Sequence, residues 1–130
     1  MNEVYEFLKK CGVYYLATTE GNQPRVRPFG TIDIYEGKLY IQTGKSKNVA
    51  NQLKANPNIE LSGMADNNWI RVTAKAVLDD NVAAQEHMLA SYPELQAQYQ
   101  PGDGNTEVYY LENVTAQICS FTEPPKTITF

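Results

Sequence analysis

The sequence predicts a mostly β fold, an antiparallel β-barrel with helices at its periphery. Segments rich in β-branched and aromatic residues follow one another closely, and short turns join most of them, which is the pattern of antiparallel strands. About six or seven such segments in one small domain favour a closed or nearly closed barrel over a doubly wound sheet. The chain has 130 residues, a length that supports one hydrophobic core. We therefore assign residues 1–130 to a single domain.

The order of the elements follows from periodicity and from turn residues. A helix is expected where apolar residues recur at helical spacing, and a strand where they alternate or cluster with β-branched residues. The expected helices cover residues 3–11, 46–55, 80–91 and 93–99, with Ser46 and Asp80 as caps. The expected strands cover residues 13–19, 25–34, 38–43, 59–65, 69–78, 108–111 and 115–121, with a short extended segment after Pro124-Pro125.

Residues 25–34 are expected to form one long strand with two different faces. Val26 and Ile32 share one parity and are expected in the core, whereas the arginines of the other parity form a polar face. Pro24 and Pro28 lack a backbone donor. Part of this strand should therefore lie at a sheet edge or a bulge.

The charge and the cysteine content exclude several classes of function. The net charge is −4, which argues against a nucleic acid or an anionic membrane surface as the partner. Two cysteines and one histidine without metal-ligand spacing argue against a metal site. The N-terminal segment lacks the apolar core of a signal peptide, and no apolar stretch is long enough to span a membrane. We expect a cytoplasmic protein with reduced cysteines.

Two arginines on one strand make a local cationic edge. Arg25 and Arg27 are two residues apart, so their side chains project from the same face, about 7 Å apart. The guanidinium group is the usual side chain for planar, bidentate recognition of an oxyanion. The pair is a candidate anion site, and the alternative is a pair of solvated strand residues.

A turn between a strand and a helix is a second candidate anion site. The sequence Thr43-Gly44-Lys45-Ser46-Lys47-Asn48 offers amide groups at a helix start, a capping hydroxyl and two lysines. Its Gly-Lys-Ser triplet matches the end of a P-loop, but Leu39 stands where the full motif needs a glycine. We expect a single phosphate rather than a nucleoside triphosphate, and the alternative is an ordinary helix cap.

Three further features carry weaker signals. Trp69 opens a strand and is expected in a pocket wall, in a subunit contact or at a structural rim. His87 has no catalytic group beside it in the sequence and is expected to be a surface or interface residue. Gly102-Asp103-Gly104 lacks the third glycine of a dinucleotide fingerprint and is expected to be a loop. Because no acid/base pair or activated nucleophile emerges, any difficult chemistry would belong to a cofactor.

Taken in order, these motifs resemble the pyridoxamine-phosphate-oxidase-like family of FMN-binding split β-barrels. The similar segments are YYLATTEGNQPRVRPFG, YEGKLYIQTGKSKNVANQLKANPNIEL, WIRVTAKAVLDD and ICSFTEPPKTITF. The resemblance covers nearly the whole chain. It implies a six-stranded antiparallel split barrel, a homodimer, and one FMN per subunit in a cleft between the subunits.

The resemblance also implies which residues contact the flavin. They are Arg25, Val26, Arg27, Pro28, Gln42, Thr43, Ser46, Lys47, Asn48 and Trp69. The first four would lie against the flavin ring and ribityl chain, the next two would contact it from the end of the following strand, and Ser46 and Lys47 would hold the phosphate. Asn48 stands where oxidases of the family often carry a lysine. Trp69 lies near the position of a glutamine that contacts the ring.

The resemblance implies an FMN-dependent oxidoreductase that passes hydride or electrons through the flavin N5 to a small-molecule acceptor. Vitamin B6 oxidation is not expected, because the arginine-rich C-terminal extension of the true pyridoxamine oxidases has no counterpart before Phe130. Small relatives include nitroimidazole reductases and general-stress proteins. The alternatives are a non-catalytic flavin-binding or sensing protein, and the same barrel binding heme or a deazaflavin.

Overall fold

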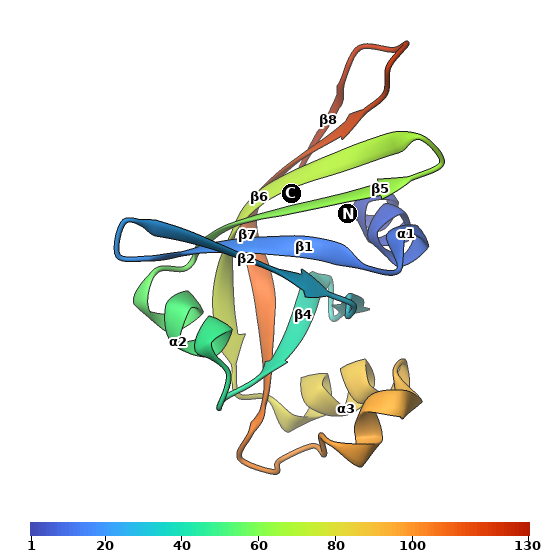
Figure 1. The fold of residues 1–130 in the computed structure, drawn as a ribbon. Helices are drawn as coiled ribbons and strands as arrows, with labels where there is room; N and C mark the ends of the chain where they lie inside the picture. Colours follow the sequence, from blue (N-terminus) through green and yellow to red (C-terminus); the bar gives the residue numbers. More distant parts are fainter.

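The computed structural model describes residues 1–130, which form one coiled sheet flanked by helices (Figure 1). The strands are β1 (Tyr14–Glu20), β2 (Gln23–Phe29), β3 (Asp33–Tyr35), β4 (Lys38–Gly44), β5 (Asn58–Ala65), β6 (Asn68–Asp79), β7 (Thr106–Cys119) and β8 (Lys126–Thr129). The helices are α1 (Asn2–Cys11), α2 (Asn48–Ala55), α3 (Val82–Ala90) and a 3-10 helix, η1 (Pro93–Ala97). Six strands have seven or more residues and two are short, so the expected six-stranded core is confirmed.

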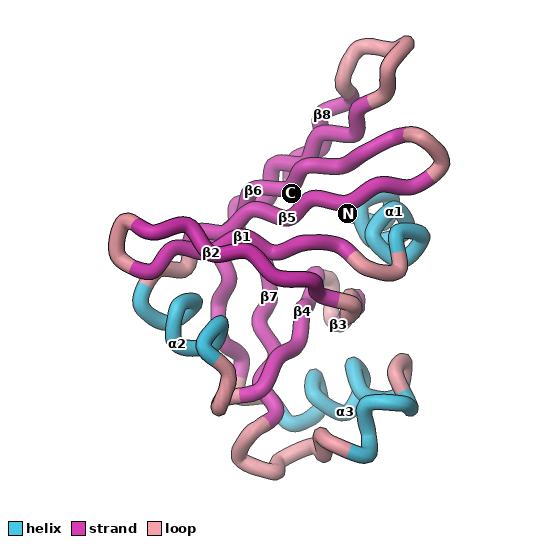
Figure 2. Tube along the Cα trace, in the orientation of Figure 1, coloured by secondary structure: helices cyan, strands magenta, loops and turns pink.

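The strands pair in the order β2-β1-β5-β6-β7-β4-β3, and β8 adds to β7. Every pairing is antiparallel. The sheet coils but does not close, because β2 and β3 remain its two edges. Figure 2 shows β1 and β2 crossing in front of β4 and β7, with α2 at one end of the β1–β2 hairpin. The mostly β split barrel predicted from the sequence is therefore confirmed.

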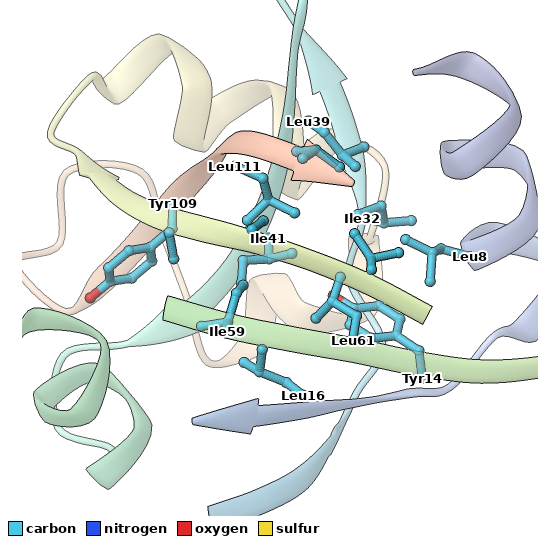
Figure 3. Close-up of a cluster of buried hydrophobic side chains, with 14 of the residues drawn as sticks. Leu8, Tyr14, Leu16, Ile32, Leu39, Ile41, Ile59, Leu61, Tyr109 and Leu111 are labelled. Atoms are coloured by element: carbon cyan, nitrogen blue, oxygen red, sulfur yellow. The ribbon is translucent and has the colours of Figure 1, made fainter. Parts of the chain in front are cut away.

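The core lies inside the coil of the sheet. Figure 3 shows aliphatic side chains from β1, β4, β5 and β7 meeting there, together with Leu8 from α1. The largest fully buried side chains are Tyr14, Tyr109, Leu8, Leu16, Ile32, Leu39, Ile41, Leu53, Leu61, Ile70, Met88 and Leu89. A second apolar cluster lies under α3, where Met88 and Tyr92 pack against Tyr40 and Val108. The inner face of the sheet is thus covered by its own curvature together with α1 and α2, and α3 covers part of the outer face at β4 and β7.

The expected long strand over residues 25–34 is wrong, because the chain leaves the ladder at residues 30–32. Side chains hold this break: the hydroxyl of Tyr14 donates to the carbonyl of Thr31 at 2.5 Å, and that of Tyr92 donates to the carbonyl of Ile32 at 3.1 Å. Because of the break, even-numbered residues face outward before it and inward after it. Val26 consequently lies outside the core, 68% exposed on the edge strand, while Pro24 and Pro28 lie at the expected edge.

Three element boundaries also differ from the expectation. β7 is one strand through Asn113, whose φ of 52° accompanies a shift of register against β6 between Thr73 and Lys75. α3 is capped by Asn81, whose Oδ1 accepts the amide of Ala83 at 2.9 Å, rather than by Asp80. α2 begins after Lys47, and no side chain caps it, so Ser46 is not its N-cap. None of the helices is both long enough and apolar enough to cross a membrane.

Candidate functional site

A hollow of about 470 Å³ opens where the β1–β2 hairpin meets the start of α2. Its lining comes from β2, from the end of β1 and from the first turns of the helix. The lining residues are Glu20, Arg25, Val26, Arg27, Lys47, Asn48, Val49 and Gln52. Five of the residues expected to bind a cofactor therefore lie together here, although they come from two segments of the chain.

Arg27 is the most tightly held cation of this hollow. Its Nη1 donates to the carbonyl of Leu16 at 3.1 Å and to Oγ1 of Thr18 at 2.8 Å, and its Nη2 donates to Oε1 of Gln52 at 2.5 Å. All three acceptors are neutral, and no carboxylate lies within ion-pair distance of this guanidinium. A guanidinium has five N–H donors, so two remain free. Burial, together with the charge of Arg25, lowers the pKa of Arg27.

Gln52 connects the helix to the arginine strand. Its side chain is buried, its Oε1 accepts from both Thr18 and Arg27, and its Nε2 donates to Oε2 of Glu20 at 3.3 Å. The sequence reasoning missed this residue. The available signal was a polar side chain on the apolar face of α2, three residues after the buried Val49. Gln52 fixes the orientation of the Arg27 guanidinium without neutralising its charge.

Arg25 differs from Arg27 in having an acidic partner. Its Nη2 lies 3.0 Å from Oε1 of Glu20, and both side chains are about half exposed. Hydrogen bonds from Arg25 and Gln52 lower the pKa of Glu20. Arg25 and Glu20 therefore cancel each other, and the net positive charge of the hollow comes from Arg27 and from Lys47, which has no ion-pair partner.

The turn before α2 uses most of its own backbone donors. The amides of Lys45 and Ser46 donate to the carbonyl and to Oδ1 of Asn105, at 2.7 and 3.1 Å, and the amide of Lys47 donates to the carbonyl of Gly44 at 3.0 Å. The first-turn amides of a helix have no intrahelical acceptor. The donors left to an anion are therefore the start of α2 and the side chains of the turn, rather than the turn's own backbone.

The remaining expected site residues do not line the hollow. Gln42 and Thr43 are buried in β4, where Oε1 of Gln42 has no hydrogen-bond partner. Pro28 lies on β2 beyond the lining residues, and Ser46 lies on the exposed turn. Trp69 pairs with Met64 at the β5–β6 turn, which Figure 1 places beside α1 and away from α2. One copy of the chain thus brings together the arginine strand and the helix start, but not the tryptophan.

A larger hollow of about 740 Å³ lies between α1 and the β5–β6 turn. Charges of both signs line it, and three of its charged residues are already engaged: Lys10 pairs with Asp66, and Glu3 pairs with Lys126 from β8. It has no half-buried cation with only neutral hydrogen-bond acceptors, as Arg27 is in the smaller hollow. We therefore place the candidate site at the smaller hollow, where charge and hydrogen-bond donors converge.

Proton-transfer groups are scarce in the smaller hollow. Glu20 is its only acid, and its lowered pKa keeps it ionised. His87 lies elsewhere, with Nδ1 2.6 Å from the buried carboxylate of Asp33 and its ring packed against Tyr35. The geometry is therefore suited to holding an anion, and not to general acid–base catalysis.

The family model described as pyridoxamine 5'-phosphate oxidase matches residues 1–118. The chain belongs to this family. No curated protein matches it. Among solved structures, a NimC/NimA family protein from Clostridium acetobutylicum is 44% identical, with a TM-score of 0.96 over 100% of this chain and 93% of that chain.

More distant members of the same fold show how widely the barrel is used. General stress protein 26 from Bacillus anthracis has a TM-score of 0.77 at 15% identity, over 99% of this chain and 97% of that one. A FAD-binding protein from Mesorhizobium loti has a TM-score of 0.62 at 17% identity, over 92% of this chain and 94% of that one. At these identities the likeness to the two proteins is one of fold. The pyridoxamine 5'-phosphate oxidase family expected from the sequence is confirmed.

Proposed function

We propose that the chain is an FMN-binding flavoprotein that works as a homodimer and transfers hydride or electrons to a small-molecule acceptor. The observation that carries this proposal is the half-buried Arg27, whose three hydrogen-bond acceptors are all neutral. A cation held in this way, beside Lys47 and the start of α2, is suited to a bound anion. Membership of the pyridoxamine 5'-phosphate oxidase family supports a flavin as the molecule that brings the anion.

The residues present fit a mononucleotide. The two cations without an acidic partner, Arg27 and Lys47, and one helix start match one phosphate, and the volume of about 470 Å³ lies in the usual range for a small-molecule site. In this proposal Arg27 binds the phosphate end together with Lys47, and not the ring and ribityl chain as the resemblance implies. Ser46, on the turn next to the hollow, is a further donor. The exposed strand β2, with Val26 at its centre, contacts the flavin ring and ribityl chain. The buried Gln42, whose Oε1 lacks a partner, and Thr43 support the strand end next to the site.

A second copy of the chain would supply the missing wall of the hollow. Val26, Tyr15 and Met64 are 68%, 52% and 61% exposed, and the strand register places them on the same outer face of the sheet. Apolar side chains gathered on one face favour a protein interface. We propose that two such faces meet and that Trp69, on this face beside Met64, approaches the flavin of the partner subunit.

The chemistry that a bound flavin supplies is hydride and electron transfer. The residues of this chain bind and orient it: Arg27 and Lys47 fix the anionic end, and the edge strand fixes the ring against the dimer interface. The chain supplies no proton-transfer group within the hollow beyond the ionised Glu20. Acceptors that need only electrons and solvent protons are therefore the substrate class that the site favours.

The test is an absorbance spectrum of the purified protein, followed by titration of the apoprotein with FMN. We expect flavin bands and a tighter complex with FMN than with a deazaflavin or heme. Anaerobic addition of NADH or NADPH should then bleach the flavin, and a nitroaromatic acceptor should restore its colour. A colourless protein that does not bind FMN would disprove the proposal.

A non-catalytic flavin carrier or sensor on the same barrel is the second candidate, and the lack of acid–base groups in the hollow favours it. Both candidates predict a yellow protein. They differ in the reoxidation of the reduced flavin, which is fast with an acceptor for an oxidoreductase and no faster than for free flavin with a carrier.

The proposed dimer has its own test. Met64→Glu places a charge on the exposed apolar face and should convert the dimer to a monomer in sedimentation experiments. Val82→Glu is the matched control, because Val82 is 44% exposed on α3, outside the proposed interface. A wild-type protein that sediments as a monomer at micromolar concentration would argue against the dimer.

A further inference from the structure

The loop from residue 100 to residue 105 packs directly against the turn that leads into α2. The carbonyl of Asn105 accepts the amide of Lys45 at 2.7 Å, and its side-chain Oδ1 accepts the amide of Ser46 at 3.1 Å. One residue, distant in the sequence, therefore fixes two consecutive peptide groups of the turn. This contact joins the loop before β7 to the segment that supplies Lys47 and Asn48 to the hollow.

Asp103 holds the loop in the conformation that makes this contact possible. Its carboxylate accepts the amides of Gln100, Asn105 and Thr106 at 3.0, 2.8 and 2.6 Å, and the hydroxyl of Thr106 at 3.0 Å. These hydrogen bonds hold the pKa of Asp103 far below its usual range. The flanking Gly102 and Gly104 have φ of 71° and 78°, a region that strongly favours glycine. The Gly-Asp-Gly sequence thus holds the loop in one conformation.

Close packing adds to the hydrogen bonds. A Cβ placed on Gly44 would lie 3.0 Å from the ring of Tyr99 and 3.2 Å from Nδ2 of Asn105. Gly44 is also the last residue of β4 and pairs with Thr106 of β7. The turn therefore packs so closely against the loop that a side chain at position 44 would not fit.

We propose that Asn105 is a positioning residue for the phosphate end of the ligand, acting through the Gly44–Lys47 turn. The inference rests on the proposed function, because it assumes that FMN occupies the hollow. By accepting the amides of Lys45 and Ser46, Asn105 sets the direction in which the chain enters α2. That direction places Lys47 and the first-turn amides of the helix at the hollow. Asn105 itself does not line the hollow.

The experiment compares FMN with riboflavin, which has the same ring and ribityl chain but no phosphate. Asn105→Ala should raise the Kd for FMN about five- to tenfold and leave the Kd for riboflavin unchanged within about twofold, since one positioning hydrogen bond is lost. Asp103→Asn weakens the hydrogen bonds that hold the loop but does not change a residue that contacts the turn. It should also raise the Kd for FMN and leave the Kd for riboflavin unchanged. Asn51→Ala is the matched control, because Asn51 is exposed on α2 and does not line the hollow. Thermal unfolding establishes that each variant is folded.

The outcomes separate this inference from the proposed function. A selective loss of FMN affinity in Asn105→Ala and Asp103→Asn supports it. An equal loss for FMN and riboflavin would show a merely structural role for Asn105, and an unchanged FMN affinity would show no role at the site. A wild-type protein that binds neither ligand overturns the proposed function and this inference together. Equal wild-type affinity for both ligands overturns the phosphate site alone.

Discussion

Arg27 donates a hydrogen bond from Nη2 to Oε1 of Gln52 at 2.5 Å, so an amide, and not a carboxylate, holds the central cation of the hollow. A glutamate at position 52 would satisfy the same hydrogen bond and would neutralise the guanidinium. The neutral amide keeps Arg27 in one orientation and leaves its charge available. A site built for an anion needs both properties at once.

Gln52→Glu is therefore predicted to weaken anion binding without unfolding the protein. The new carboxylate would pair with Arg27 and compete with the ligand phosphate, and we expect the Kd for FMN to rise at least about tenfold, or about 1.4 kcal/mol. Repulsion from Glu20, whose carboxylate lies 3.3 Å from Nε2 of Gln52, offsets the stability gained from the new ion pair. Fluorescence titration with FMN and thermal unfolding measure the two effects.

The matched control for this variant is Gln98→Glu, which makes the same change of charge at an exposed residue outside the hollow. It should leave FMN affinity unchanged. If Gln52→Glu bound FMN as tightly as the wild type, the charge of Arg27 would have no part in ligand binding.

The two arginines are predicted to contribute unequally. Arg27→Ala removes the uncompensated cation and should cost about 1–3 kcal/mol of FMN binding, as expected for charge-assisted hydrogen bonds. Arg25→Ala should cost less than about 1 kcal/mol, because Arg25 is half exposed and already paired with Glu20. Isothermal titration of both variants decides the order. A larger loss for Arg25→Ala would reverse the assignment of the phosphate contact.

The tyrosines predict how the fold responds to alkaline pH. Burial raises the pKa of Tyr14, Tyr40 and Tyr109, and hydrogen bonds to carboxylates add to the effect for the last two. In the unfolded chain these phenols ionise near pH of about 10, whereas the folded protein retains their protons. The free energy of unfolding should therefore fall as the pH rises above about 10, by up to about 1.4 kcal/mol per pH unit for each tyrosine.

Urea unfolding measured across this range tests the alkaline prediction. Tyr109→Phe should make the slope of the unfolding free energy against pH shallower by the contribution of about one proton, because a single titrating group is lost. Tyr5→Phe is the matched control, since Tyr5 lies on α1 outside the proposed dimer interface and its hydroxyl makes no hydrogen bond within the chain, and it should leave the slope unchanged. If the free energy of unfolding did not fall between about pH 10 and about pH 11, the folded protein would not keep these protons more tightly than the unfolded chain does.

The fold was predictable from the sequence because turns and strand-forming residues mark nearly every element. Which side chains of the arginine strand face the core was not predictable. The break at residues 30–32 depends on hydrogen bonds from Tyr14 and Tyr92, which come from distant elements. Local alternation placed Val26 in the core. The tertiary contacts reverse the face after the break and leave Val26 exposed.

The candidate site was predictable only in part. Arg25, Arg27 and Lys47 carry charge in recognisable local patterns, and they do line one hollow. The contribution of Gln52 depends on the packing of α2 against β1. This packing brings Gln52 into contact with Arg27, which is 25 positions away in the sequence. The contribution of Asn105 depends on its contact with Ser46, which is 59 positions away in the sequence. No local spacing encodes either contact.

The contact between α1 and β5 gives the final prediction. A Cβ on Gly63 would lie 2.9 Å from Sγ of Cys11 and 3.2 Å from Cβ of Tyr14, so Gly63→Ala should destabilise the protein by about 1–3 kcal/mol through overpacking. Cys11→Ala removes the closer of the two atoms. The double variant should therefore be more stable than the sum of the single effects predicts, by at least about 0.5 kcal/mol. Additive effects in urea unfolding would show that the helix can move away from the sheet and that this contact does not fix its position.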